Sequence, residues 1–209
     1  MLYNLLWPIA WIVTHLICRY HVSGREHVPH TGPLIVVANH LSWFDPILLA
    51  LVLPRRIWFF AKAEIFRWPI VGWLCHATGQ IPVHRGVSDR AALEKALVYL
   101  REGKAVVVFP EGTVERQEKM IATHTGVAML ALRSGATILP VAHSGTRRIL
   151  RSWRSWFPRV IIQIGEPYVP ALTEGAARKA ELQSITQDVM ERIATMLPPE
   201  QRGVYRREA

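Results

Sequence analysis

The segment from Asn39 to Pro46 contains residues that could carry out acid–base chemistry. It reads Asn-His-Leu-Ser-Trp-Phe-Asp-Pro, so that Asp45 follows His40 by five residues. A carboxylate bonded to one ring nitrogen of a histidine fixes its tautomer and stabilises the imidazolium, which leaves the other nitrogen to act as a general base. Neither a Ser-x-Gly elbow nor an activated cysteine is evident in the sequence. The pair therefore predicts a base that takes a proton directly from a substrate hydroxyl.

The same segment has two other interpretations. Asn39 or Ser42 could cap the N-terminus of a helix, and His40 would then be incidental. A catalytic zinc site needs three protein ligands, and no second histidine or acidic residue stands at helical spacing from His40. Spacing alone leaves the catalytic pair and the helix cap open, and it disfavours a metal.

Two further polar motifs follow apolar runs. Phe109–Thr113 reads Phe-Pro-Glu-Gly-Thr, a turn that can offer backbone amides and a carboxylate to a polyol or a phosphate. Gly79–Gly86 has an alternating pattern that predicts a short strand ending in Arg85, whose guanidinium could bind a phosphate with two hydrogen bonds. A simple strand-ending turn and an exposed surface arginine are the alternatives for these two motifs.

The elements that must position these motifs are strands with continuous apolar runs. Such runs are typical of strands that are covered on both faces. They occupy Leu34–Ala38, Ala105–Phe109, Thr137–Val141 and Val160–Ile164. Two of the polar motifs begin where the first two runs end, which is where the reactive groups of a parallel sheet gather.

Helical patterns separate the runs. One helix is expected from a cap at Ser88 or Asp89 to a stop at Gly103, and another over Gly126–Ser134. A long C-terminal helix places a stripe of apolar residues on one face and ends at Pro198. The members of this stripe are Leu182, Ile185, Val189, Ile193 and Met196. The alternation predicts an α/β fold with a mixed, largely parallel sheet flanked by helices.

Composition limits the class of protein. The chain has 209 residues, of which half are hydrophobic and only two are cysteines. This length suits a single domain, and the composition excludes a disordered chain or a disulfide-stapled scaffold. The net charge of +9 predicts an anionic partner, which could be a nucleic acid, a membrane surface or a phosphate on a substrate.

The N-terminus is expected to form a membrane-associated helical segment over residues 1–22, followed by the catalytic domain over residues 23–209. Leu2–Cys18 is almost wholly apolar, and no Lys or Arg precedes Arg19, unlike in a secretory signal. A helix of this length extends about 25 Å, less than the roughly 30 Å of the hydrocarbon core. We therefore expect an interfacial or embedded helix, with a single short span or a buried core helix as alternatives.

The polar motifs together resemble a known family. The sequence contains His-x4-Asp, then Gly-x-Ile-Pro-Val-x-Arg, then Phe-Pro-Glu-Gly-Thr, then Ile138–Val141. This order resembles the 1-acylglycerol-3-phosphate acyltransferase family, within the glycerophosphate acyltransferase superfamily, over Gly24–Val141. The resemblance implies that His40 is the catalytic base and Asp45 its partner. It also implies that Arg85 and the Glu111-Gly112-Thr113 turn contact the glycerol phosphate, and that Pro140 shapes the acyl side of the pocket.

The resemblance also implies a reaction. A fatty acyl group would move from a thioester of coenzyme A or acyl carrier protein to the sn-2 hydroxyl of lysophosphatidate, with no metal or redox cofactor. Val114 and His124 stand where the family usually has basic residues, so another lysolipid or a glycolipid is an alternative acceptor. A non-catalytic membrane-surface module is a further alternative, which the presence of both His40 and Asp45 disfavours.

The expected location is the cytoplasmic face of a membrane. Arg19 and Arg25 follow the apolar segment, and basic residues favour the cytoplasmic side. Residues 55–68 and 147–159 mix arginine with aromatic residues, a pattern that suits a lipid surface. The alternatives are solvated loops with tryptophans folded into the core, or a nucleic-acid surface, which the apolar N-terminus and the four motifs disfavour.

Overall fold

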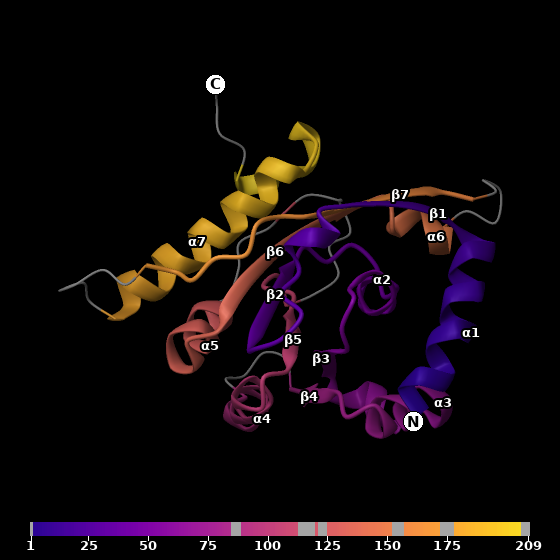
Figure 1. Cartoon of the computed structure of the whole chain (residues 1–209), viewed down its shortest axis with the longest axis horizontal. Coiled ribbons are helices and arrows are strands. Elements are labelled where there is room, and N and C mark those ends of the chain that lie inside the picture. Colours follow the sequence, from indigo (N-terminus) through magenta and orange to yellow (C-terminus); the bar gives the residue numbers. More distant parts are fainter. Residues whose placement is uncertain are drawn as a thin grey trace.

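The chain folds around one mixed sheet with helices on both faces, as the sequence predicts (Figure 1). The computed structural model describes residues 2–84, 89–112, 120, 125–151, 157–171 and 178–205. Within these residues the strand order is β1-β7-β6-β2-β5-β3-β4, and every neighbouring pair is parallel except β6 with β7. The strands are β1 (Arg19–Ser23), β2 (Leu34–Ala38), β3 (Ile57–Lys62), β4 (Ile81–Val83), β5 (Ala105–Val108), β6 (Thr137–Ser144) and β7 (Arg159–Ile164).

The helices lie in two groups. Figure 1 shows α4, α5 and α7 on one side of the sheet, and α1 and α2 on the other. The helices are α1 (Leu2–Ile17), α2 (Asp45–Val52), α3 (Pro69–Ala77), α4 (Arg90–Arg101), α5 (Gly126–Ser134), α6 (Arg147–Arg151) and α7 (Arg178–Met196). Short 3-10 turns cover Arg25–His27, Ala63–Arg67, Pro199–Gln201 and Gly203–Tyr205.

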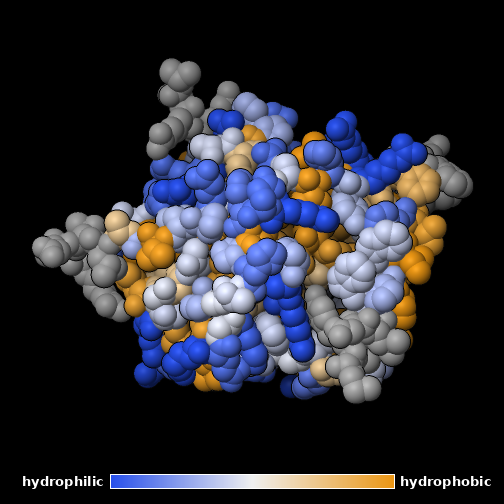
Figure 2. Space-filling model, in the orientation of Figure 1, coloured by the Kyte–Doolittle hydropathy of each residue, from blue (hydrophilic) through white to orange (hydrophobic). Residues whose placement is uncertain are grey.

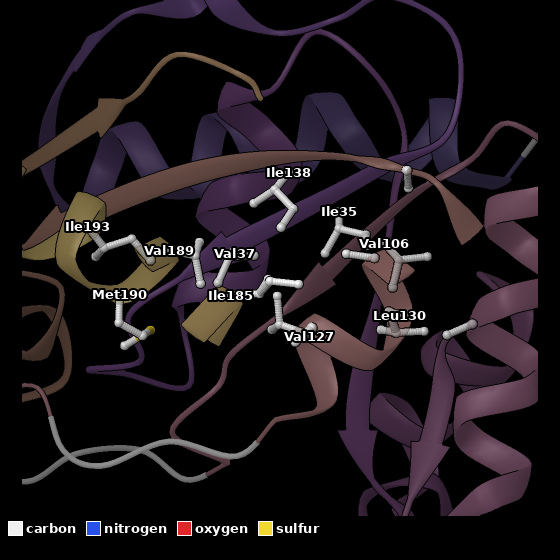
Figure 3. Packing of buried hydrophobic residues seen from close by; sticks show 14 of the residues in the cluster. Ile35, Val37, Val106, Val127, Leu130, Ile138, Ile185, Val189, Met190 and Ile193 are labelled. Atoms are coloured by element: carbon white, nitrogen blue, oxygen red, sulfur yellow. The ribbon is translucent and has the colours of Figure 1, made fainter. Parts of the chain in front are cut away.

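Each face of the sheet has its own core, because successive side chains of a strand point to opposite faces. In β2, Ile35 and Val37 pack with the helices α4, α5 and α7, and Figure 3 shows the residues around them. Val36 and Ala38 pack on the other face with Leu48 and Leu49 of α2. The continuous apolar runs are explained by this burial on both faces.

The predicted helix boundaries from Asp89 onward are confirmed. Asp89 caps α4 by accepting a hydrogen bond from the backbone N–H of Ala92. Gly135 ends α5 in the left-handed conformation, with φ of 64°. The C-terminal helix α7 ends at Met196, just before the two prolines.

The structure corrects two expectations. The N-terminal helix ends at Ile17, and residues 19–23 form the edge strand β1 instead of continuing the helical segment expected over 1–22. Within residues 55–68, expected at the surface, Ile57–Lys62 forms the internal strand β3. Trp58 of this strand is buried. Arg55, which precedes the strand, donates to the carbonyls of Pro29, Gly32 and Gly103. The arginine and the aromatic residues of this segment therefore belong to the fold of the domain.

In the part of the chain that the structure describes, no helix combines the length and the hydropathy that a membrane span needs.

Candidate active site

His40 and Asp45 form a buried pair at the carboxyl end of β2. The imidazole Nδ1 lies 2.8 Å from Asp45 Oδ2, and the side chains are 9% and 0% exposed. A carboxylate only accepts hydrogen bonds, so Nδ1 carries the proton. The remaining nitrogen, Nε2, is then the one that can accept a proton from a substrate.

The chain between the two residues is a tight turn that is held by the carboxylate. Asp45 Oδ2 also accepts the backbone N–H groups of Leu41, at 2.8 Å, and of Ser42, at 2.7 Å. Asp45 is the first residue of α2, and the side chain of Asn39 bonds to β6 instead of to a helix. The helix-cap interpretation of Asn39 and Ser42 is therefore wrong: α2 has no side-chain cap.

The surroundings keep Asp45 ionised. Burial raises the pKa of this carboxyl, but the nearby His143, the hydrogen bond from His40 and the backbone N–H of Ser42 outweigh it, so that the pKa lies below its ordinary value. An anionic Asp45 beside Nδ1 stabilises the imidazolium that forms when His40 accepts a proton.

The predicted turn after β5 supports His40 from a second direction. Glu111 is buried, and its Oε2 accepts the backbone N–H of His40 at 3.0 Å. The ring of Phe109 stacks on the imidazole, with the ring centroids 4.2 Å apart. Gly112 turns the chain in the left-handed conformation, with φ of 66°, and donates its N–H to the carbonyl of Phe109. This turn therefore fixes both the backbone and the ring of the base.

A cavity of about 590 Å³ opens beside His40. Its polar lining includes His40, His84, Asp89 and Thr125. Most of the other lining side chains are apolar and come from β3, β4, α4, β5, the turn that follows β5, and α5. They are Phe60, Val83, Ala92, Leu93, Val108, Phe109, Pro110, Val127, Met129 and Leu130. The cavity can therefore hold an apolar chain next to the base.

The remaining predicted site residues are not all brought together. Arg85 and Thr113 lie outside the described residues, as do Val114 and His124. Pro140 is buried within β6, opposite Val37 of β2, and does not line the cavity. Pro140 lies on the face of the sheet that α7 covers. Its place on the acyl side of the pocket stays a prediction.

Two histidines near the base were missed from the sequence. His84 bonds through Nδ1 to Asp89 Oδ2 at 2.9 Å, and the five-residue spacing of the pair repeats that of His40 and Asp45. His143 of β6 is fully buried, with Nε2 3.7 Å from Asp45 Oδ2. The repeated spacing could have revealed the first, whereas the second appears only once β6 is placed beside β2.

Among the residues that the structure describes, no group of three or more His, Cys, Asp or Glu side chains is arranged to hold a metal ion. The polar groups instead form hydrogen bonds around one imidazole.

Comparisons with known proteins point to one family. The family model described as Acyltransferase matches residues 19–144. The chain is 34% identical over 142 residues to a lyso-ornithine lipid O-acyltransferase of Pseudomonas aeruginosa, covering 68% of this chain and 53% of that protein. It is 30% identical over 208 residues to a 1-acyl-sn-glycerol-3-phosphate acyltransferase of Chlamydomonas reinhardtii, covering 95% of this chain and 62% of that protein.

A solved structure shares the fold. The crystal structure of the 1-acyl-sn-glycerophosphate acyltransferase PlsC from Thermotoga maritima superposes with a TM-score of 0.71 at 29% identity, covering 91% of this chain and 77% of that one. The chain spans between half and two thirds of the length of the two relatives from Pseudomonas and Chlamydomonas.

Proposed function

The chain belongs to the acyltransferase family, and on that premise we propose that it is a 1-acyl-sn-glycerol-3-phosphate acyltransferase. It would transfer a fatty acyl group from a thioester of coenzyme A or acyl carrier protein to the sn-2 hydroxyl of lysophosphatidate, which gives phosphatidate. The observation that carries this proposal is the buried His40–Asp45 pair beside a largely apolar cavity.

The proposed mechanism uses one base and no covalent enzyme intermediate. His40 Nε2 accepts the proton of the acceptor hydroxyl while the hydroxyl oxygen attacks the thioester carbonyl. Asp45 stabilises the resulting imidazolium through Nδ1. The tetrahedral intermediate then breaks its carbon–sulfur bond, and the imidazolium returns the proton to the leaving thiolate. A positioned base of this kind contributes about 10²–10⁴-fold to the rate.

The cavity and the turn after β5 have different roles in the proposed reaction. The apolar lining accommodates a fatty acyl chain. Arg85 and Thr113 remain the proposed contacts for the phosphate. Glu111 is better suited to hold His40, because its carboxylate already accepts the His40 N–H and would repel an anionic phosphate.

A second acceptor has support of its own. A phosphate monoester carries close to two negative charges, and Val114 and His124 replace two cations that the family pattern would supply. One relative is named for acylating a lyso-ornithine lipid. A lyso-aminolipid is therefore the alternative acceptor, with the same base and the same thioester donors.

An assay with purified protein in detergent tests both acceptors. Radiolabelled acyl thioester is offered with lysophosphatidate, lyso-ornithine lipid and a neutral monoacylglycerol, and the products are separated by chromatography. We expect the fastest turnover with lysophosphatidate, and turnover at least about 10²-fold slower with His40→Ala. Faster turnover with lyso-ornithine lipid would replace the first acceptor with the second. A folded wild type that acylates no lysolipid would contradict the enzymatic function.

We also propose that the enzyme binds the surface of a bilayer from the cytoplasmic side. Large apolar side chains are exposed on three neighbouring elements, and we call them the tryptophan surface. They are Trp7, Trp11 and Leu16 of α1, Trp43 and Ile47 around the start of α2, and Trp68, Ile70 and Trp73 around α3. Figure 2 shows apolar residues along the edge of the molecule where α1 lies. Tryptophan favours the interface between headgroups and hydrocarbon.

The tryptophan surface reaches the catalytic motif. Trp43 lies between His40 and Asp45 in the sequence, is 55% exposed, and stacks on Trp68 with the ring centroids 6.1 Å apart. In a vesicle-flotation assay, Trp68→Ser combined with Trp73→Ser should lower binding to vesicles of phosphatidylcholine and phosphatidylglycerol. Val169→Ser, which removes an exposed apolar residue outside this surface, is the matched control. Equal flotation of both variants would contradict the proposed surface.

A further inference from the structure

The carboxylate of Asp45 has a second histidine within reach. His143 Nε2 lies 3.7 Å from the same Oδ2 that bonds to His40. Among the described residues, neither nitrogen of His143 has a hydrogen-bond partner, and neither does Asp45 Oδ1. Burying polar groups without a partner costs free energy. The unpartnered atoms of His143 and Asp45 lie next to the pair that contains His40 and therefore need an explanation.

The backbone of His143 is held in place by the residue that precedes the base. The Asn39 side chain donates to the carbonyl of His143 at 2.9 Å and accepts its N–H at 3.0 Å. Both hydrogen bonds are buried. Asn39 therefore ties β6 to the end of β2 and fixes the separation between the two histidines.

We propose that His143 is a positioning residue that donates a hydrogen bond from Nε2 to Asp45 and so keeps the carboxylate aligned with His40. This inference rests on the proposed function. The observed 3.7 Å is longer than a hydrogen bond, and a shift of less than about 1 Å closes it. Hydrogen bonds in active sites are often long in the free enzyme and shorten in the complex with substrate.

Burial suits a neutral donor at His143. Burial lowers the pKa of His143 and His40 acts in the same direction, which together outweigh the opposite effect of the Asp45 carboxylate. On the same face of the sheet, burial raises the pKa of the Cys18 thiol to about 11, which keeps it neutral. Arg147 and Arg148 begin the helix α6 and are partly or fully exposed. Glu111 approaches from β5 and bonds to the backbone of His40.

Loss of this donor changes the charge balance at His40 in a defined direction. A neutral donor on Asp45 offsets part of the negative charge that acts on the His40 imidazole. Without this donor the carboxylate stabilises the imidazolium more strongly. Because His40 must be neutral to act, the acid limb of the pH–rate profile moves to higher pH.

Two nearly isosteric variants test the donor. His143→Met has no N–H, whereas His143→Gln keeps one near the position of Nε2. We expect His143→Met to move the acid limb of kcat/KM upward by about half to one pH unit and to lower kcat severalfold. We expect His143→Gln to restore the limb to that of the wild type. His27→Leu, which removes a histidine bonded to the carbonyl of Ile164, is the control and should leave the limb unchanged.

A second readout separates this inference from the proposed function. The titration of His40 is followed by nitrogen NMR on the full chain in detergent micelles, which requires no turnover. If the wild type acylates no lysolipid but the imidazolium of His40 still persists to higher pH in His143→Met than in the wild type, the coupling stands and the proposed function fails. An unchanged His40 titration and acid limb in folded His143→Met overturns the inference. If that variant does not fold, His143→Leu decides the result by the same criteria.

Discussion

The molecule contains two His-x4-Asp pairs whose local geometry is nearly the same and whose surroundings differ. In both, Nδ1 of the histidine bonds to Oδ2 of the aspartate, at 2.8 Å for His40–Asp45 and 2.9 Å for His84–Asp89. In both, the aspartate stands at the start of a helix. The imidazole is 9% exposed in the first pair and 72% exposed in the second.

The carboxylates also serve different partners. Asp45 accepts the N–H groups of Leu41 and Ser42 as well as the imidazole, and all of its bonds stay within the catalytic turn. Asp89 uses Oδ1 to cap α4 through Ala92. Water competes for the exposed His84 imidazole, so its bond to Asp89 is weak and its orientation is not fixed. Burial and hydrogen bonding of the imidazole, and not the spacing of the pair, therefore distinguish the proposed base from a histidine beside a helix cap.

The largest expected difference is between the two histidines. His40→Ala should lower kcat by at least about 10²-fold, because it removes the proposed general base. His84→Ala should lower kcat by less than about threefold, because the exposed imidazole has no part in the proton transfer. Steady-state kinetics of both variants, with circular dichroism to verify folding, measure the contrast. Equal losses in the two variants would show that the exposed pair also acts on the substrate.

The aspartates give a smaller contrast. Asp45→Asn keeps an oxygen for the N–H groups of the turn but loses the charge that stabilises the imidazolium. We expect kcat to fall by about tenfold or more, and less than in His40→Ala. Asp89→Asn should change kcat by less than about twofold, since asparagine caps helices as well as aspartate does. A normal kcat for folded Asp45→Asn would show that the negative charge of Asp45 is not needed for the reaction.

The sequence predicted those strands whose pattern of apolar residues matches their burial in the folded protein. The runs Leu34–Ala38 and Thr137–Val141 are strands, because β-branched residues there are buried on both faces. The strands β1 and β3 were missed for the opposite reason. The strand β1 lies at the edge of the sheet, and its exposed positions, such as His21, carry polar residues, so that it has no continuous apolar run. The arginines that flank β3 suggested a surface segment.

The same limit applies to the site. Asp45 is close in sequence to His40, so that spacing alone suggested the pair, and the structure supports it. His143 is more than 100 residues away, and its place beside Asp45 depends on the pairing of β2 with β6. Glu111 was expected at the substrate, yet it bonds to the His40 backbone, since the turn after β5 lies next to the end of β2.

The stability of α4 tests whether Asp89, in the exposed pair, acts as a helix cap. Asp89→Ala removes the cap on Ala92 and should lower the free energy of unfolding by about 1 kcal/mol. Asp89→Asn keeps the cap and should cost a few tenths of that. Thermal or urea unfolding monitored by circular dichroism measures both. A loss in Asp89→Asn as large as in Asp89→Ala would mean that the charge beside His84, and not the cap, stabilises this helix end.

The smallest expected effect is the dependence of stability on pH through Asp89. Hydrogen bonds from the backbone N–H of Ala92 and then of His84 lower the pKa of Asp89 from 3.8 to about 2. Since the folded state has the lower pKa, the ionised carboxylate stabilises the fold above about pH 4, and this stabilisation is lost as the pH falls towards 2. Asp45 adds a loss in the same direction, because its pKa is also lowered.

Comparing wild type with Asp89→Asn cancels the Asp45 contribution. Urea unfolding at pH 6 and pH 3 should therefore show a larger loss of stability for the wild type than for Asp89→Asn. The difference should be smaller than the cap effect, because solvent screens a carboxylate at the rim of the cavity. Equal losses in the two proteins would show that the charge of Asp89 contributes nothing to the fold. The buried pair would then be the one His-x4-Asp pair, among the described residues, whose charge matters.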